Sequence, residues 1–206
     1  MTLFQEISST SHDLSTPDLL RLLIEETFPG KTVVTASLRA RSVVVLKLVA
    51  DIDPATPVVF CRPGKLFPES VEYRDKLVER LGLTNILESR GGEVDVRPGD
   101  DDHYENMWAE YLTGLGRVHE IVHLNDTLAP YDCWISAVYH FARSPHAHHR
   151  VDVEGRLIRV DPLIRWIRDD VRQFMREHDL PFHPRAAGRR AGPPRDEAPC
   201  PPTYHF

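Results

Sequence analysis

The sequence predicts an α/β fold in which a mostly parallel sheet is flanked by helices. Short runs rich in β-branched residues alternate with helical patterns from about residue 30 to 90. Such alternation is typical of parallel strands, because each crossover between them requires a helix-sized connection. A later apolar run extends the same sheet, and a period-two pattern predicts a hairpin after it. Its 206 residues, 41% hydrophobic and 27% charged, suit one globular domain.

The first helix should begin at Thr16-Pro17 and end near Phe28-Pro-Gly30. A capping hydroxyl and a proline in the first turn precede a leucine-rich run, which favours a helix start at this point. Three strands and two helices should then alternate: strands at 32–36, 57–61 and 85–88, and helices at 42–51 and 68–82.

The second half should contain helices near 103–113 and 117–126, a buried strand at 133–138, a hairpin over 150–160 and a helix over 169–178. From Pro184 on, proline, glycine and arginine dominate without periodicity. We therefore expect one domain over residues 1–184 and an irregular tail over 185–206. Ligands of open parallel sheets bind beyond the carboxyl ends of the strands, which directs attention to the loops after Ala36, Cys61 and Val138.

Composition excludes several classes of protein. A net charge of −6 argues against broad attraction to nucleic acid, and no run of about 18 apolar residues is present to span a membrane. Three scattered cysteines cannot form a disulfide framework, and the N-terminus lacks the pattern of a secretory signal. A cytoplasmic protein that binds neither nucleic acid nor membrane is expected.

The run Gly64-Lys-Leu-Phe-Pro-Glu-Ser70, placed after an apolar strand, resembles the second-strand motif of the phosphoadenylyl-sulfate and adenylyl-sulfate reductases. The resemblance covers about residues 16–184 and includes three further runs: 132–136, 159–163 with Trp166, and 176–184. It implies a Rossmann-like sheet of the adenine nucleotide alpha-hydrolase type and a small anionic substrate. Family members are often homo-oligomers, which leaves oligomerisation as an open expectation.

The loop Ser37-Leu-Arg-Ala-Arg-Ser42 matches the family's Ser-x-Gly-x-(Asp/Glu)-Ser loop, which receives the phosphate or sulfate end of the nucleotide. Arg39 stands at the glycine position and Arg41 at the acid position. Either the two arginines grip an anion, or they are solvated side chains at a lost site. The candidate substrate-binding residues are Ser37, Arg39, Arg41, Ser42, Gly64 and Lys65.

The family's cysteines are largely missing. Iron–sulfur members use a cysteine pair and a later Cys-x-x-Cys, but the matching positions read Leu115-Gly116 and Glu197-Ala-Pro-Cys200. No iron–sulfur cluster is therefore expected. The family's reductive cysteine has no counterpart in Tyr204-His-Phe206 either, which predicts that reductase chemistry is lost. Cys61 and Cys133 lie in predicted strands and should be buried.

A histidine pattern suggests different chemistry. His119-Glu120-x-x-His123 is the motif of zinc peptidases, and its histidines share one helix face. His140 and His146 align with substrate-binding arginines of the family. Imidazole suits zinc, iron or copper, so we predict a divalent transition-metal site of these four histidines, with Glu120 as the catalytic base. Chance occurrence is the alternative, and the predicted fold excludes a peptidase.

The sequence thus predicts an enzyme, derived from the reductase family, that uses a histidine-bound metal to hydrolyse or oxidise a small anionic substrate. One alternative is a non-catalytic member that binds a nucleotide or a partner protein. The other is a reductase that uses Cys200 in place of the usual thiol.

Overall fold

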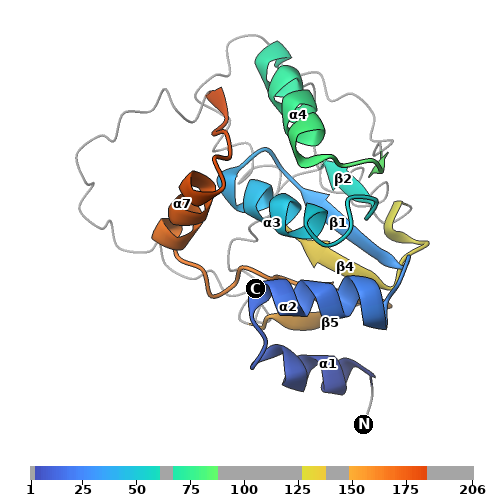
Figure 1. The fold of residues 1–206 in the computed structure, drawn as a ribbon. Coiled ribbons are helices and arrows are strands. Elements are labelled where there is room, and N and C mark those ends of the chain that lie inside the picture. Colours follow the sequence, from blue (N-terminus) through green and yellow to red (C-terminus); the bar gives the residue numbers. More distant parts are fainter. Residues whose placement is uncertain (1–2, 61–66, 88–126, 138–148, 185–206) are drawn as a thin grey trace, which may run out of the picture.

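The computed structural model describes residues 3–60, 67–87, 127–137 and 149–184 (Figure 1). These residues form a six-stranded sheet with the strand order β3-β2-β1-β4-β6-β5. Neighbouring strands are parallel except for the antiparallel pair β5 and β6. The predicted fold class, a mostly parallel sheet flanked by helices, is confirmed.

The strands are β1 (Thr32–Ala36), β2 (Val58–Phe60), β3 (Ile86–Leu87), β4 (Cys133–Ser136), β5 (Val151–Glu154) and β6 (Leu157–Val160). The helices are α1 (Leu3–Ser11), α2 (Thr16–Arg21), α3 (Ala40–Ala50), α4 (Pro68–Leu81) and α7 (Arg168–Glu177), with a π-helical segment η1 (Leu22–Thr27) that continues α2. Each strand and helix predicted within the described ranges is present, and α1 was not predicted. The helices predicted near 103–113 and 117–126 lie outside the described residues, and the boundary after residue 184 stays a prediction.

Local chemistry explains where the first long helical segment begins and ends. The Ser15 hydroxyl accepts a hydrogen bond from the Asp18 amide at 3.2 Å, and Pro17 occupies the first turn. At the other end the Phe28 amide donates to the Leu23 carbonyl at 3.0 Å, five residues back, which is the wider π spacing. Gly30 follows with φ +68°, a conformation that favours glycine.

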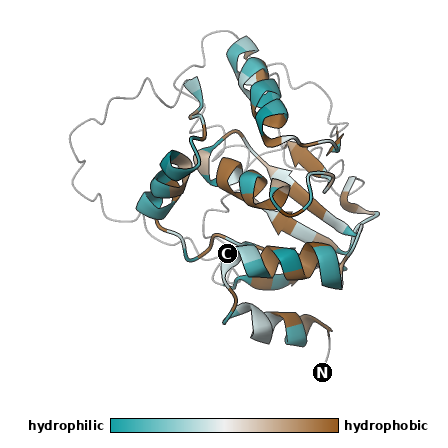
Figure 2. Ribbon diagram, in the orientation of Figure 1, coloured by the Kyte–Doolittle hydropathy of each residue, from teal (hydrophilic) through white to brown (hydrophobic). Residues whose placement is uncertain are grey.

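The sheet separates two apolar layers because successive strand residues point to opposite faces. Val34 and Ala36 of β1 belong to the large cluster formed with α2, η1, α3, α4 and α7, whereas Val33 joins a smaller cluster with Trp134 on the other face. All five residues of β1 are buried. Figure 2 shows apolar colour over much of α3 and hydrophilic colour on the outer faces of α4 and α7. The large cluster therefore holds the helices on one face of the sheet.

The β5–β6 hairpin ends the sheet on one side. Gly155, with φ +63°, begins its two-residue connection, and Glu154 pairs with Leu157 across it. Asp152 and Arg159 face each other in the register, with a carboxylate-to-guanidinium distance of 3.6 Å. The predicted hairpin is confirmed.

Arg150, just before β5, ties the N-terminal helices to the sheet. Its Nη1 donates to the carbonyls of Ser11 at 2.6 Å and Leu14 at 2.7 Å, and its Nη2 to the Thr16 hydroxyl at 3.2 Å. The residue is 6% exposed, so these carbonyls have little access to water. Arg150 thus satisfies polar groups at the junction between α1 and α2 that would otherwise be buried without partners.

The β6–α7 turn (residues 161–167) is held by the same junction. The Thr16 hydroxyl donates to the Pro162 carbonyl at 3.1 Å and accepts from the Trp166 indole at 3.2 Å. The start of α2 and the turn after β6 are therefore fixed to each other although they lie far apart in sequence. In the ranges that the structure describes, no helix combines the length and apolar character needed to cross a bilayer.

Arg150→Ala should lower the free energy of unfolding by about 2 kcal/mol, because it leaves the buried Ser11 carbonyl and the partly buried Leu14 carbonyl without donors. Urea unfolding followed by circular dichroism measures the change. The control is Arg156→Ala, which removes an ion pair to Asp132 between side chains that are 54% and 51% exposed, and should change stability by less than about 0.5 kcal/mol. Equal losses in the two variants would contradict the assignment.

Candidate functional site

The direction of winding reverses at β1. From β1 the chain passes to β2 and β3 on one side, and β4 then pairs with β1 on the other. Because β1 and β4 are parallel, their carboxyl ends lie at the same edge of the sheet, where Thr35 pairs with Ser136. Open α/β sheets bind ligands at such a reversal, outside the carboxyl ends of the strands. We call this place the β1–β4 crevice.

Two buried serines brace the turn between β1 and α3. The hydroxyls of Ser37 and Ser42 are 2.9 Å apart, and the Ser42 hydroxyl also accepts from the Ser37 amide at 3.0 Å. The Ser42 hydroxyl donates its one hydrogen to the Ala137 carbonyl at 2.7 Å, just after β4. Ser37 must therefore be the donor between the two hydroxyls. This network joins the ends of β1 and β4 at the crevice.

The N-terminus of α3 faces the same edge of the sheet, because α3 follows β1 directly. Arg39 is the N-cap residue, in an extended conformation and without a side-chain cap hydrogen bond. The first-turn amides of a helix have no partners within the helix and carry partial positive charge. The arrangement can therefore receive an anion.

Arg41, in the first turn of α3, binds protein carbonyls. Its Nη1 donates to Trp166 at 3.0 Å and its Nη2 to Leu163 at 2.6 Å, both in the β6–α7 turn. Its side chain is 22% exposed. The sequence suggested two interpretations of Arg41: a side chain that binds an anion, or a solvated side chain. Neither interpretation included these contacts with main-chain carbonyls.

Asp161 lies beside Arg41, with 3.9 Å between the Arg41 Nη2 and an Asp161 carboxylate oxygen. The same carboxylate accepts from the Leu163 amide at 3.2 Å. Burial raises the pKa of Asp161, while Arg41, the Leu163 amide and two further arginines act in the opposite direction. The carboxylate thus belongs to the internal structure of the β6–α7 turn.

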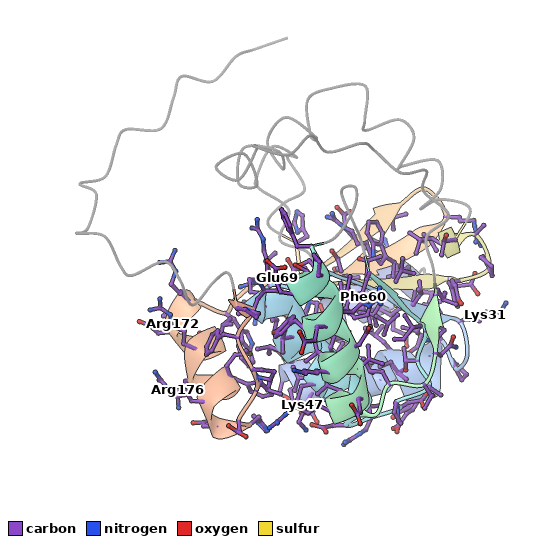
Figure 3. The ribbon with its side chains drawn as sticks, turned by 90° about the horizontal axis from the view of Figure 1, so that it is seen from above. Lys31, Lys47, Phe60, Glu69, Arg172 and Arg176 are labelled. Atoms are coloured by element: carbon purple, nitrogen blue, oxygen red, sulfur yellow. The ribbon has the colours of Figure 1, made fainter. Side chains whose placement is uncertain are left out.

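A second contact joins α4 to the chain after α7. The His183 Nε2 lies 3.0 Å from the Ser70 hydroxyl, and the Tyr73 hydroxyl donates to the Pro181 carbonyl at 2.7 Å. The rings of Tyr73 and His183 meet edge to face with centroids 5.0 Å apart, and burial raises the pKa of Tyr73 to about 12. Figure 3 labels Glu69, the neighbour of Ser70 in the first turn of α4, and so shows at which end of α4 Ser70 lies.

The sequence did not predict this contact. Its two sides, which contain Ser70 and His183, lie in separate runs that carry the family resemblance. The sequence did indicate both runs, because each resembles the family, but that resemblance does not show that the two runs are in contact.

Several predicted site residues lie outside the described residues. These are Gly64 and Lys65 of the substrate set, His119, His123, His140 and His146 of the metal set, and the base Glu120. Within the described part of the chain, no group of three or more histidine, cysteine, aspartate or glutamate side chains is arranged to hold a metal ion. Of the predicted set, Ser37, Arg39, Arg41 and Ser42 lie in the described segment from β1 to the first turn of α3, where the hydroxyls of Ser37 and Ser42 meet. The role of these four residues in binding substrate stays a prediction.

Cys133 is fully buried, as the sequence predicted for a small residue within a strand. Burial raises the pKa of its thiol to about 12. Cys133 is therefore a packing residue that is protonated at neutral pH, and it is unsuited to nucleophilic attack. Cys61 and Cys200 lie outside the described residues.

Comparisons with known proteins connect this site to a family. The sequence model of the phosphoadenosine phosphosulfate reductase domain matches residues 31–185. A phosphoadenosine 5'-phosphosulfate reductase of Alkalilimnicola ehrlichii is 31% identical over 76% of this chain and 65% of its own length. An adenosine 5'-phosphosulfate reductase of Mesorhizobium japonicum is 31% identical over 82% of this chain and 66% of its own length. The chain therefore spans slightly less than two thirds of these relatives.

A solved structure agrees on the fold. The phosphoadenylyl-sulfate reductase of Candida auris, determined as a phosphate complex, matches with a TM-score of 0.65 and 18% identity. The match covers 91% of this chain and 92% of that chain.

These findings correct the predicted function. The relatives are named as reductases, so the prediction that reductase chemistry gave way to a histidine-bound transition metal is wrong. Helical spacing aligned His119 with His123 but said nothing about where His140 and His146 lie relative to them. The described residues contain no metal-binding group that supports the prediction.

Ser42→Ala should lower the free energy of unfolding by about 2 kcal/mol, because the Ala137 carbonyl and the Ser37 amide lose their partner. Ser9→Ala, which removes an exposed hydroxyl bound to the Glu6 carbonyl, is the matched control and should cost less than about 0.5 kcal/mol. Thermal and urea unfolding measure both variants. If Ser42→Ala is no more destabilising than Ser9→Ala, the proposed brace is wrong.

Tyr73→Phe should lower stability at pH 8 by about 1 kcal/mol, through loss of the hydrogen bond to Pro181. The folded state raises the pKa of Tyr73 from 10.0 to about 12, so the unfolded chain releases this proton first as the pH rises. The stability that Tyr73 gives the wild type is thus complete below pH 10 and declines toward pH 12. Urea unfolding at pH 8 and pH 11 should show the difference between the two proteins narrowing. A constant difference would contradict the assignment.

Proposed function

This chain belongs to the phosphoadenosine phosphosulfate reductase family, and from that premise we propose that it binds a 5'-sulfonucleotide in the β1–β4 crevice and acts in its reduction to sulfite. The observation that carries the proposal is the family match over residues 31–185, which includes every strand of the described sheet. Two relatives at 31% identity are named for phosphoadenosine phosphosulfate and adenosine phosphosulfate. The shared chemistry is an adenine nucleotide whose 5'-phosphate carries a sulfate group.

The described residues suit the anionic end of such a ligand. The amides at the start of α3 carry partial positive charge, and Arg39 at the N-cap adds a formal positive charge beside them. Ser37 and Ser42 brace the turn so that this helix start is fixed relative to β4. In the proposed complex, backbone amides bind the anion, while the buried hydroxyls keep them in place.

Cys133 cannot supply the thiol that reduces the sulfonucleotide. Two thiols reduce a sulfonucleotide by breaking its sulfur–oxygen bond, which yields sulfite, the free nucleotide and one disulfide. Cys133 is buried and protonated at neutral pH. Because each turnover oxidises two thiols to a disulfide, an added dithiol must be present in any activity assay, whichever further thiol takes part.

Two expectations from the resemblance remain proposals. The chain has three cysteines, which cannot supply the four thiolates of a cysteine-bound iron–sulfur cluster, so we propose that this chain alone binds none. A homo-oligomeric state also stays a prediction.

The test is binding followed by turnover. Calorimetric titration with adenylyl sulfate and, separately, phosphoadenylyl sulfate should show saturable binding of at least one of them. Sulfite should then appear when that nucleotide is incubated with the chain and either dithiothreitol or a thioredoxin system. Absence of binding at millimolar concentrations of both nucleotides overturns the proposal, and binding without sulfite overturns its reductase part.

Arg39→Glu locates the bound anion. Reversing the charge at the N-cap of α3 should weaken nucleotide binding at least about tenfold, which is about 1.4 kcal/mol. Arg21→Glu is the control, because it reverses a side chain that is 55% exposed on α2 and should leave the affinity within about twofold. Unchanged affinity in Arg39→Glu would place the anion somewhere other than the crevice.

A further inference from the structure

Arg41 connects the first turn of α3 to the β6–α7 turn. Its two terminal nitrogens reach the carbonyls of Leu163 at 2.6 Å and Trp166 at 3.0 Å, across 122 and 125 residues of sequence. A planar guanidinium can donate to two acceptors at once in a fixed geometry. The contact therefore fixes both the distance and the orientation between the two segments.

The partner segment is itself firmly held. The Asp161 amide donates to the Arg150 carbonyl at 2.9 Å, and the Asp161 carboxylate accepts from the Leu163 amide. At the other end of the turn, the Trp166 indole donates to the Thr16 hydroxyl. Arg41 thus ties the start of α3 to a turn that the sheet and α2 already position.

The first turn of α3 is consequently held from two sides. Ser42 bonds it to the Ala137 carbonyl beyond β4, and Arg41 bonds it to the turn beyond β6. Both attachments come from adjacent residues of the turn whose amides are proposed to receive the anion. A small rotation of this turn would redirect those amides, because they point along the helix axis.

The structure assigns Arg41 as a positioning residue that fixes the first turn of α3 at the β1–β4 crevice by binding the Leu163 and Trp166 carbonyls. Its effect on ligand affinity rests on the proposed function, whereas the clamp itself does not.

Hydrogen exchange tests the clamp without any ligand. In Arg41→Ala the amides of residues 43–46, which donate to the carbonyls of the first turn, should exchange at least about tenfold faster than in the wild type, because that turn has lost one of its two attachments. The matched control is Arg80→Ala. Arg80 also bonds a carbonyl and a carboxylate, both of Asp179, but does so at the C-terminal end of α4. That variant should leave exchange at 43–46 unchanged.

Affinity then separates positioning from direct contact. Arg41→Ala should weaken binding of the adenylyl or phosphoadenylyl sulfate at least about tenfold, and Arg80→Ala should not. Asp161→Asn keeps an oxygen acceptor for the Leu163 amide but removes the negative charge beside Arg41. If Arg41 contacted the anion directly, Asp161→Asn would strengthen binding, whereas the clamp predicts affinity within about twofold of the wild type.

Each outcome decides between the alternatives. Unchanged exchange at 43–46 in Arg41→Ala overturns the inference, as does tighter binding in Arg41→Ala or Asp161→Asn. If Arg41→Ala does not fold, Arg41→Lys, which keeps the charge but loses the two-carbonyl geometry, is compared in the same way and should show intermediate exchange. If the wild type binds neither nucleotide, the proposed function fails, and the exchange comparison alone decides whether the clamp exists.

Discussion

The central position of β1 is the constraint on which the rest of the structure depends. β1 pairs in parallel with β2 on one side and β4 on the other, and all five of its residues are buried. Each parallel neighbour is reached through a long crossover connection, so the chain crosses over to one side of β1 for β2 and later to the other side for β4. The carboxyl end of β1 is left where the two directions of winding separate. The turn to α3, the two serines and the helix start all gather there for this topological reason.

Arginines bound to backbone carbonyls make several of the long-range connections around this centre. Arg150 holds the α1–α2 junction, Arg41 holds the β6–α7 turn, and Arg80 holds the residue that ends the turn after α7. Ion pairs contribute less, since most of those in the described ranges lie on exposed side chains. A guanidinium has five donors, and one such side chain can satisfy several carbonyls that a folded turn leaves without partners. The segments after β6 and after α7 are attached to the helical layer in this way.

The fold was predictable because its signals are local, whereas the contacts at the site are not. Alternating β-branched runs and capped helices located each strand and most helices in the described ranges. Helix α1 was missed because it is only nine residues long and ends in serine and threonine, which are weak helix formers, and because its position depends on the distant Arg150. The loop from Ser37 to Ser42 was found through its resemblance to a family motif. The partners of Arg41 could not be found, because a backbone carbonyl has no residue type that a sequence could reveal. The metal hypothesis, which the reductase relatives contradict, rested on spacing within one segment, and such spacing cannot show whether histidines of other segments lie near it.

Contacts to backbone carbonyls also affect how this protein can diverge. Leu163 and Trp166 accept these two hydrogen bonds through their main-chain oxygens, so replacement of either side chain leaves the acceptor in place. No compensating substitution is then needed at position 41, and no change of side chain at 163 or 166 can restore the bonds when position 41 changes. Pairs of positions joined in this manner leave no correlated substitutions between relatives. Covariation methods would therefore detect the packing of β1 against its neighbours and remain blind to the link between α3 and the β6–α7 turn.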